Sequence, residues 1–218
     1  HAVVARLPEL TVVGITGSAG KTSTKDLVAS VLRMAGETVA PPGSFNNEIG
    51  HPYTALRCDD GTRFLVAEMS ARGIGHIAHL AESVPPHIGV VLNVGSAHLG
   101  EFGSRENIAQ AKGELIESLP ADGVAVLNAD DPFVAAMASR TRARVVSYSA
   151  HGRADLWADD IRLDDVARAS FTLHAGHTSA PVTLQVFGEH QVSNALAAAA
   201  VGLEAGLTPA QVAQGLSG

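Results

Sequence analysis

Cysteine is almost absent from this chain, because Cys58 is the only one among 218 residues. A single cysteine excludes a framework of disulfides within the chain. Long apolar runs are also missing, since no segment approaches the ~20 uninterrupted apolar residues that a membrane-spanning helix needs. The first residues show no basic-then-apolar secretory pattern. We therefore expect a soluble cytoplasmic protein that does not insert into a membrane.

Positive charge is scarce as well, because the formal net charge is −7. No basic run occurs, and this disfavours a nucleic-acid partner, whose phosphates require clustered Lys and Arg. Lysine is rarer still, since Lys21, Lys25 and Lys112 are the only three among the 15 basic residues. Because the chain otherwise uses arginine, its few lysines are expected at positions where a compact or deprotonatable amine is needed. For Lys25 we expect no such use, but a solvated position on a helix.

The first motif is the segment 14–24, GITGSAGKTST, which follows an apolar strand-like run. A strand, a glycine-rich turn and a helix in this order form a nest of backbone N–H groups that binds phosphate. The common phosphate-loop spacing has glycine where this chain has Ile15. Lys21 would reach the β- and γ-phosphates of ATP, and the Thr22 hydroxyl would bind Mg²⁺. The predicted ATP-binding residues here are Gly17, Ser18, Ala19, Gly20, Lys21, Thr22 and Ser23.

Apolar strand-like segments alternate with helical ones as far as residue 150. This alternation predicts an α/β fold with a P-loop-type, mostly parallel sheet and helices on both faces. Beyond it, segments of alternating polarity predict a small antiparallel β annex at about 150–187. We expect a linker stub at 1–9 and one domain over 10–218. The expected strands are 11–16, 64–69, 88–94, 124–128, 144–148, 156–163, 169–174 and 181–187, and the expected helices are 22–35, 74–83, 105–119, 132–140, one from 191 and one from 209.

Two candidate metal ligands lie at strand ends, where open parallel sheets collect their ligands. Glu68 ends the strand 64–69 and is well placed to coordinate Mg²⁺ beside the phosphate loop. The alternative for Glu68 is an ion pair with a neighbour such as Arg72. Asn93 and His98 bracket the end of the next strand. Imidazole is not the preferred ligand of Mg²⁺, so His98 is a candidate only through its position beside the other groups.

Lys112 lies in the segment AQAKGE on a predicted helix. One interpretation is an exposed lysine that pairs with Glu114 or Glu117. The other is a desolvated amine near a metal, which loses its proton easily, adds CO₂ and becomes an anionic carbamate ligand.

Three amides are candidate binding residues. Asn46 and Asn47 lie in a polar loop between two prolines, where they would bind a polar ligand or form Asx turns. Asn194 lies on an Ala-rich helix, where adenine recognition and a hydrogen bond within the helix are both open interpretations.

Several segments in the same order resemble the central ATPase domain of the Mur ligases, the amide ligases of peptidoglycan synthesis. The family often has asparagine where this chain has Gln191, which weakens the expected contact with the nucleotide there. The matching segments are 14–25, 46–50, 68–69, 93–103, 109–114, 128–131 and 190–200.

The resemblance implies an activity. ATP would phosphorylate the free carboxylate of a UDP-muramoyl tripeptide, and the amine of D-Ala-D-Ala would attack the acyl phosphate. It also implies catalytic roles for Lys21, Glu68, His98 and Lys112. Thr22 and Glu68 would hold one Mg²⁺, and His98 with carbamylated Lys112 a second. Asn194 would face the adenine, and Asn46 or Asn47 the UDP-muramoyl substrate.

Mur ligases have three domains, so the resemblance identifies this chain as the middle one. We expect it to fold alone as a monomer, to bind nucleotide weakly and to form no amide without the N-terminal UDP-binding domain and the C-terminal domain. Another Mur ligase and folylpolyglutamate synthase, which shares the loop and the metal chemistry, are the related alternatives. A P-loop phosphotransferase or nucleotide switch is the unrelated one, although the guanine-reading pattern Asn-Lys-x-Asp is absent.

Overall fold

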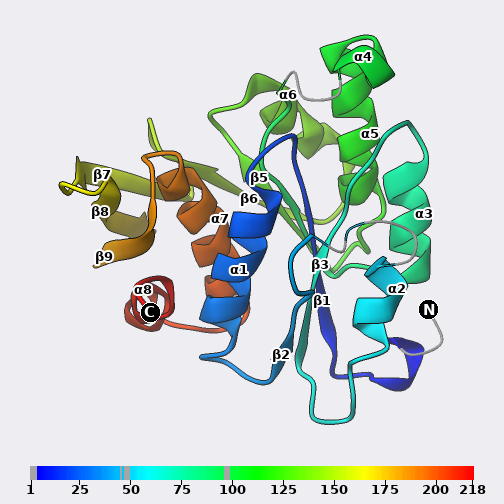
Figure 1. Ribbon diagram of the computed structural model, residues 1–218, viewed down its shortest axis with the longest axis horizontal. Helices are drawn as coiled ribbons and strands as arrows, with labels where there is room; N and C mark the ends of the chain where they lie inside the picture. The colour runs from blue at the N-terminus through cyan, green and yellow to red at the C-terminus, as the bar shows by residue number, and fades with distance from the viewer. Residues whose placement is uncertain (1–3, 45, 47–49, 96–98) are drawn as a thin grey trace.

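Nine strands pair into a single sheet at the centre of the computed structural model (Figure 1). The structure describes residues 4–44, 46, 50–95 and 99–218, without the side chains of residues 99 and 101. The strands are β1 (Thr11–Thr16), β2 (Thr38–Val39), β3 (Phe64–Glu68), β4 (Ile88–Val91), β5 (Val124–Asn128), β6 (Arg144–Ser149), β7 (Leu156–Leu163), β8 (Arg168–Ala175) and β9 (Thr178–Phe187).

The strand order is β2-β3-β1-β4-β5-β6-β7-β8-β9. All pairs from β2 to β7 are parallel, and the β7–β8 and β8–β9 pairs are antiparallel. The predicted fold class is therefore confirmed. The predicted antiparallel annex is present too, but it continues the main sheet, because β7 pairs with the end of β6 at Tyr148 and Ser149.

Helices cover both faces of the parallel part of this sheet. In Figure 1, α1, α7 and α8 lie on one side of it, and α2, α3 and α5 lie on the other. In the described part of the chain, every helix is too short or too polar to cross a membrane. The helices are η1 (Val4–Arg6), α1 (Lys21–Leu32), α2 (Gly50–Ala55), α3 (His76–Ser83), α4 (Leu99–Phe102), α5 (Arg105–Glu117), α6 (Pro132–Ala135), η2 (Ala136–Arg140), α7 (Gln191–Glu204) and α8 (Pro209–Leu216).

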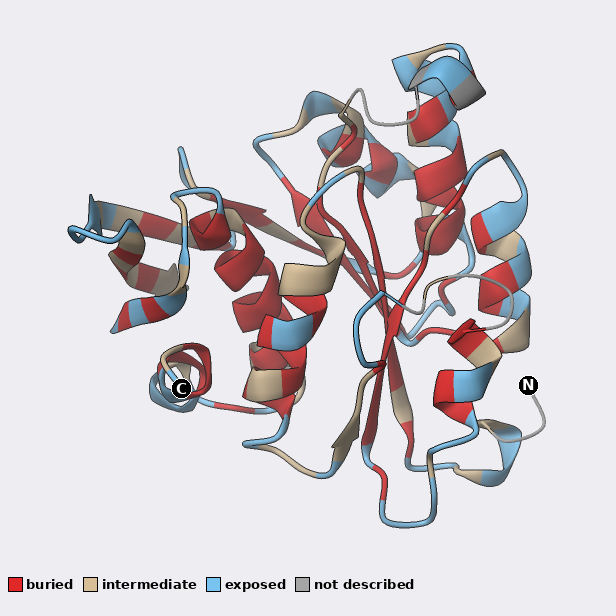
Figure 2. Ribbon diagram, viewed as in Figure 1, coloured by how far each residue is buried: buried red, intermediate tan, exposed pale blue. Residues whose placement is uncertain are grey.

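The two faces follow from the alternation of side chains along each strand. In β5, Val124 and Val126 join the apolar cluster under α1 and α7, whereas Ala125 and Leu127 join the cluster under α5. Buried residues accordingly run along the central strands and the inner sides of the helices (Figure 2). The near-continuous apolar strands of the sequence are thus explained by burial on both faces.

Some element ends differ from the prediction. Strand β4 stops at Val91 instead of residue 94, and the next two residues hydrogen-bond to the end of β1 and the turn that follows it, from the Leu92 amide to the Thr16 carbonyl and from the Ser18 amide to the Asn93 carbonyl. The expected helix 132–140 divides into α6 and a 3₁₀ turn, η2. Helix α8 begins as predicted, with Thr208 as N-cap and proline in its first turn.

Helices α1 and α7 pack so closely that only glycine fits at one contact. A Cβ atom on Gly202 would lie 2.4 Å from Cγ1 of Val31 and 3.0 Å from Cγ2 of Val212. Four consecutive alanines, Ala197 to Ala200, are fully buried on the same helix. Small residues on α7 therefore allow the close approach of α1 to this helix.

The variant Gly202→Ala tests this constraint. We expect it to lower the free energy of unfolding by about 1–3 kcal/mol, because the added methyl group overpacks the contact with Val31. Gly152→Ala is the control, since its Cβ would make only an ordinary contact at 3.6 Å with Ser149. Urea unfolding of both variants measures the difference, and equal stability of Gly202→Ala and the parent would contradict the account.

Candidate nucleotide and metal site

The phosphate loop joins β1 to α1 in the predicted way. Gly17 is buried against Leu92, where a Cβ would lie 2.9 Å from the Leu92 Cβ. Gly20 has a φ of 82°, a left-handed conformation that glycine adopts without strain, and α1 begins at the next residue. The first turn of α1 has no acidic residue and no side-chain cap. Its backbone N–H groups and the positive end of its dipole therefore suit an anion.

Lys21 folds back over this loop. Its Nζ donates a hydrogen bond to the Gly17 carbonyl oxygen at 2.9 Å. Burial lowers the pKa of the Lys21 amine, and the nearby Glu68 carboxylate opposes that shift. The amine is therefore held near the loop by a single neutral acceptor, which a phosphate oxygen can replace.

Glu68 lies at the same sheet edge, because parallel pairing of β1 and β3 puts it opposite Ile15. Its carboxylate is 1% exposed. Oε2 accepts a hydrogen bond from the Thr22 hydroxyl at 3.0 Å, and Oε1 accepts one from the Asn46 side-chain amide at 2.8 Å. The alternative for Glu68 was an ion pair with a neighbour such as Arg72. Among the contacts of the described residues, Glu68 is instead hydrogen-bonded to these two neutral groups.

The donor set around Glu68 suits Mg²⁺, which prefers carboxylate and hydroxyl oxygens. In the described residues the hydrogen-bond donors to this carboxylate are neutral, and a divalent cation would add the opposite charge that favours a buried carboxylate, as the nearby Lys21 amine does. Within the described ranges, no three His, Cys, Asp or Glu side chains gather into a cluster. Two of the predicted residues, Asn47 and His98, lie outside the described residues.

Of the two interpretations of Lys112, the desolvated amine is the one that its position supports. It is 6% exposed on α5. Burial and, to a smaller extent, the charge of Lys21 lower its pKa to about 8. Its expected partners are engaged elsewhere: Glu114 accepts the amides of Gly75 and Ala78 at the start of α3, and Glu117 pairs with Arg140. The exposed, ion-paired alternative is therefore wrong.

The Asn93 side chain holds the phosphate loop through hydrogen bonds to its backbone. Its Oδ1 accepts the amides of Ser18 at 3.0 Å and Ala19 at 2.9 Å, and its Nδ2 donates to the Ala19 carbonyl at 3.1 Å. The Ser18 hydroxyl in turn accepts the Gly95 amide at 2.9 Å. In this structure the Ser18 and Ala19 amides thus serve the loop itself. That these two residues bind ATP stays a prediction.

Two further residues hold the segment after β4 and were not predicted. Asp131 accepts the Val94 amide at 2.7 Å, while the Arg105 guanidinium donates to the Val94 carbonyl at 2.6 Å. Asp131 is also the N-cap of α6. An arginine that binds a backbone carbonyl across the fold leaves no pattern in the sequence.

Asn194 packs against the phosphate loop from the side of α7. Its Nδ2 donates to Oε1 of Gln191 at 2.9 Å, so a hydrogen bond within the helix is present. Its Oδ1 lies 2.7 Å from the place of a Cβ on Gly20. Any other residue at position 20 would push Asn194 away. Contact with adenine stays a prediction, as does the role of the half-buried Ser23.

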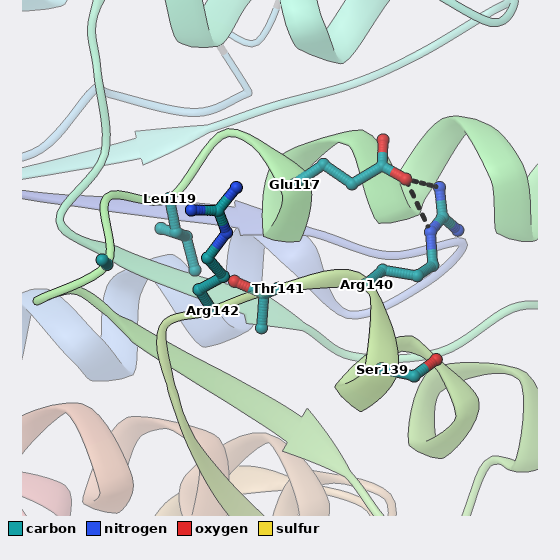
Figure 3. Close-up of a pocket in the computed structure, with 7 residues that line it drawn as sticks. Glu117, Leu119, Ser139, Arg140, Thr141 and Arg142 are labelled. Atoms are coloured by element: carbon teal, nitrogen blue, oxygen red, sulfur yellow. Dashed lines mark hydrogen bonds and ion pairs between the residues drawn. The ribbon is translucent and has the colours of Figure 1, made fainter.

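A cavity of about 530 Å³ lies away from these groups, where the end of α5 meets the segment before β6 (Figure 3). Arg140 turns there toward Glu117 and donates to the carbonyls of Ala109 and Gln110 at 3.0 Å each. Its guanidinium covers Gly113 so closely that a Cβ there would collide with Nη1. The polar groups of this cavity therefore fasten η2 to α5, and none of the predicted site residues lines it.

The chain is similar to known proteins over most of its length. The family described as "Mur ligase middle domain" matches residues 15–202. The UDP-N-acetylmuramoyl-tripeptide--D-alanyl-D-alanine ligase of Mycobacterium tuberculosis is 62% identical over 95% of this chain and 41% of its own length. The protein of that name from Escherichia coli is 36% identical over 94% of this chain and 46% of its own length.

Solved structures share the fold. MurF from Acinetobacter baumannii superposes with a TM-score of 0.92 at 34% identity, over 98% of this chain and 47% of that one. MurF ligase from Thermotoga maritima in complex with ADP has a TM-score of 0.88 at 32% identity, over 99% of this chain and 49% of that one. The chain thus spans less than half the length of the relatives it matches. It belongs to the Mur ligase middle-domain family.

Proposed function

We propose that this chain is the ATP- and Mg²⁺-binding middle domain of a ligase that adds D-Ala-D-Ala to a UDP-N-acetylmuramoyl tripeptide. The observation that carries the proposal is the meeting of Lys21, Thr22, Glu68 and Lys112 at one edge of the sheet. The printed names of the 62% and 36% identical relatives support the choice of substrates. The ADP complex of the Thermotoga protein supports the choice of nucleotide.

The site residues fit a transfer of the γ-phosphoryl group to a carboxylate. The start of α1 and Lys21 would bind the triphosphate and hold its negative charge. Thr22 and Glu68 would hold Mg²⁺, which supplies charge neutralisation between the two anions, the triphosphate and the carboxylate. The carboxylate oxygen attacks the γ-phosphorus and ADP leaves. The amine of D-Ala-D-Ala then attacks the acyl carbon, and inorganic phosphate and a proton leave.

Lys112 is proposed as a carbamate. Its neutral amine attacks CO₂, a C–N bond forms and the nitrogen releases one proton to solvent, so that the neutral amine becomes an anionic carbamate. At pH 7 a pKa of about 8 leaves about a tenth of the amine neutral, against about 0.03% for an ordinary lysine. The carbamate and His98 would hold a second Mg²⁺. We also propose a monomer that works in the cytoplasm, where ATP is supplied.

The proposed activity is tested by phosphate release from the full-length protein with ATP, Mg²⁺ and the UDP-muramoyl tripeptide. We expect release to depend on D-Ala-D-Ala and to stop when this dipeptide is replaced by free D-alanine or glutamate. Phosphate release with glutamate and a folate would instead identify the protein as a folylpolyglutamate synthase. Release with ATP alone would indicate a nucleotide switch.

The carbamate is tested by ¹³CO₂ labelling of the full-length protein. We expect a carbamate carbon signal that Lys112→Arg removes, because a guanidinium does not add CO₂. At fixed dissolved CO₂ the signal grows as pH rises through about 8, since deprotonation of Lys112 exposes its lone pair. Arg33→Lys, at an exposed position after α1, is the control for unspecific labelling. An unlabelled parent protein, or a label that persists in Lys112→Arg, would contradict the proposal.

A further inference from the structure

Lys25 is not the solvated helix residue that the sequence predicts. It lies one turn beyond Lys21 in α1 and is only 2% exposed. Its Nζ donates hydrogen bonds to the carbonyl oxygens of Pro41 at 2.8 Å and Gly43 at 3.0 Å. It also pairs with Oδ1 of Asp26 at 2.8 Å, a side chain that is 67% exposed. The buried ammonium is thus directed mainly at the backbone of one loop.

That loop follows β2, and its last described residue contacts the side chain of Glu68. Residues 42–44 are exposed, and neither a helix nor a strand holds them. Lys25 fastens the loop at its beginning. At its far end the Asn46 side chain donates to Glu68, and the Asn46 carbonyl accepts the Ser70 amide at 3.2 Å.

The contacts close into a ring that begins and ends on α1. Thr22 binds Glu68, Glu68 binds Asn46, and the loop before Asn46 returns to Lys25, three residues after Thr22. Both ends of the ring therefore lie on the helix whose first turn forms the proposed phosphate site. Glu68 accepts one hydrogen bond from each arm of this ring.

The fold alone does not require a charge at position 25. Burial of an ammonium costs free energy unless its partners offset that cost. The two neutral carbonyls and the exposed carboxylate around Lys25 offset it only in part. A methionine is of similar length and would fill the same space without that cost. What lysine provides and methionine does not is the pair of hydrogen bonds to Pro41 and Gly43.

We infer that Lys25 is a positioning residue for the metal site: it fixes the loop so that Asn46 orients the Glu68 carboxylate toward Mg²⁺. The inference rests on the proposed function, because it assumes that Glu68 holds the metal of a bound nucleotide. Groups that orient a ligand through a hydrogen bond affect metal affinity although they do not touch the metal.

The test is nucleotide binding by the full-length protein, with Mg²⁺ and with a chelator in its place. We expect Lys25→Met to bind Mg²⁺-free ATP within about twofold of the parent, and to need about tenfold more Mg²⁺ for half of the metal-dependent gain in affinity. Asp26→Asn is the matched control, because it removes the ion pair and keeps both carbonyl contacts. It should behave like the parent.

A double-mutant cycle with Asn46→Ser separates positioning from stability. If Lys25 acts through Asn46, the double variant needs no more Mg²⁺ than the worse single variant. Additive effects, an equal loss of affinity with and without Mg²⁺, or a lowered melting temperature with unchanged Mg²⁺ dependence would overturn the inference. Lys25→Gln gives the same comparison if Lys25→Met does not fold. A parent protein that fails to bind ATP would instead overturn the proposed function.

Discussion

The hydrogen bond between Thr22 and Glu68 joins the two halves of the site. Thr22 belongs to the first turn of α1, and Glu68 ends the neighbouring strand β3. Parallel pairing of β1 with β3 brings these two chain ends to one edge of the sheet. A hydrogen bond to a charged group contributes about 1.5–3 kcal/mol, and more is lost when a buried carboxylate keeps no partner. The proposed phosphate and metal parts of the site therefore depend on one another.

Charge at this edge is unbalanced in a way that suits its proposed ligands. Lys21 and Lys112 are desolvated amines close enough for the charge of Lys21 to lower the pKa of Lys112. Glu68 is a buried carboxylate with neutral donors. A triphosphate would compensate the amines, and Mg²⁺ would compensate the carboxylate. Electrostatic terms of this kind are strong because the groups are removed from water.

Much of this arrangement was predictable because it follows from local patterns. The strand–loop–helix order located Lys21 and Thr22, and the rule that ligands gather at strand ends located Glu68. Burial of Lys112 agreed with one of two interpretations, but the sequence did not choose between them. Helix periodicity does not tell which neighbours of an amine are taken by other partners, as Glu114 and Glu117 are.

The contacts that the sequence did not predict are long-range bonds to backbone atoms. Lys25 binds carbonyls 16 and 18 residues away, and Asn93 binds amides 74 and 75 residues away. Any residue type has such carbonyls and amides, so the partner carries no signature. The annex was predicted because its strands change from buried to alternating patterns, and these patterns do not tell whether it joins the main sheet. Only the pairing of Tyr148 and Ser149 with β7 shows that the sheet continues.

The central claim is that one triphosphate with its divalent ion is bound at this sheet edge. A crystal structure of the full-length protein with a non-hydrolysable ATP analogue and Mg²⁺ tests it most directly. The account predicts the γ-phosphate at the Lys21 amine, and a metal ion in contact with the Thr22 hydroxyl or the Glu68 carboxylate. Nucleotide bound elsewhere, or a metal ion with no oxygen from Thr22 or Glu68 around it, would contradict the account.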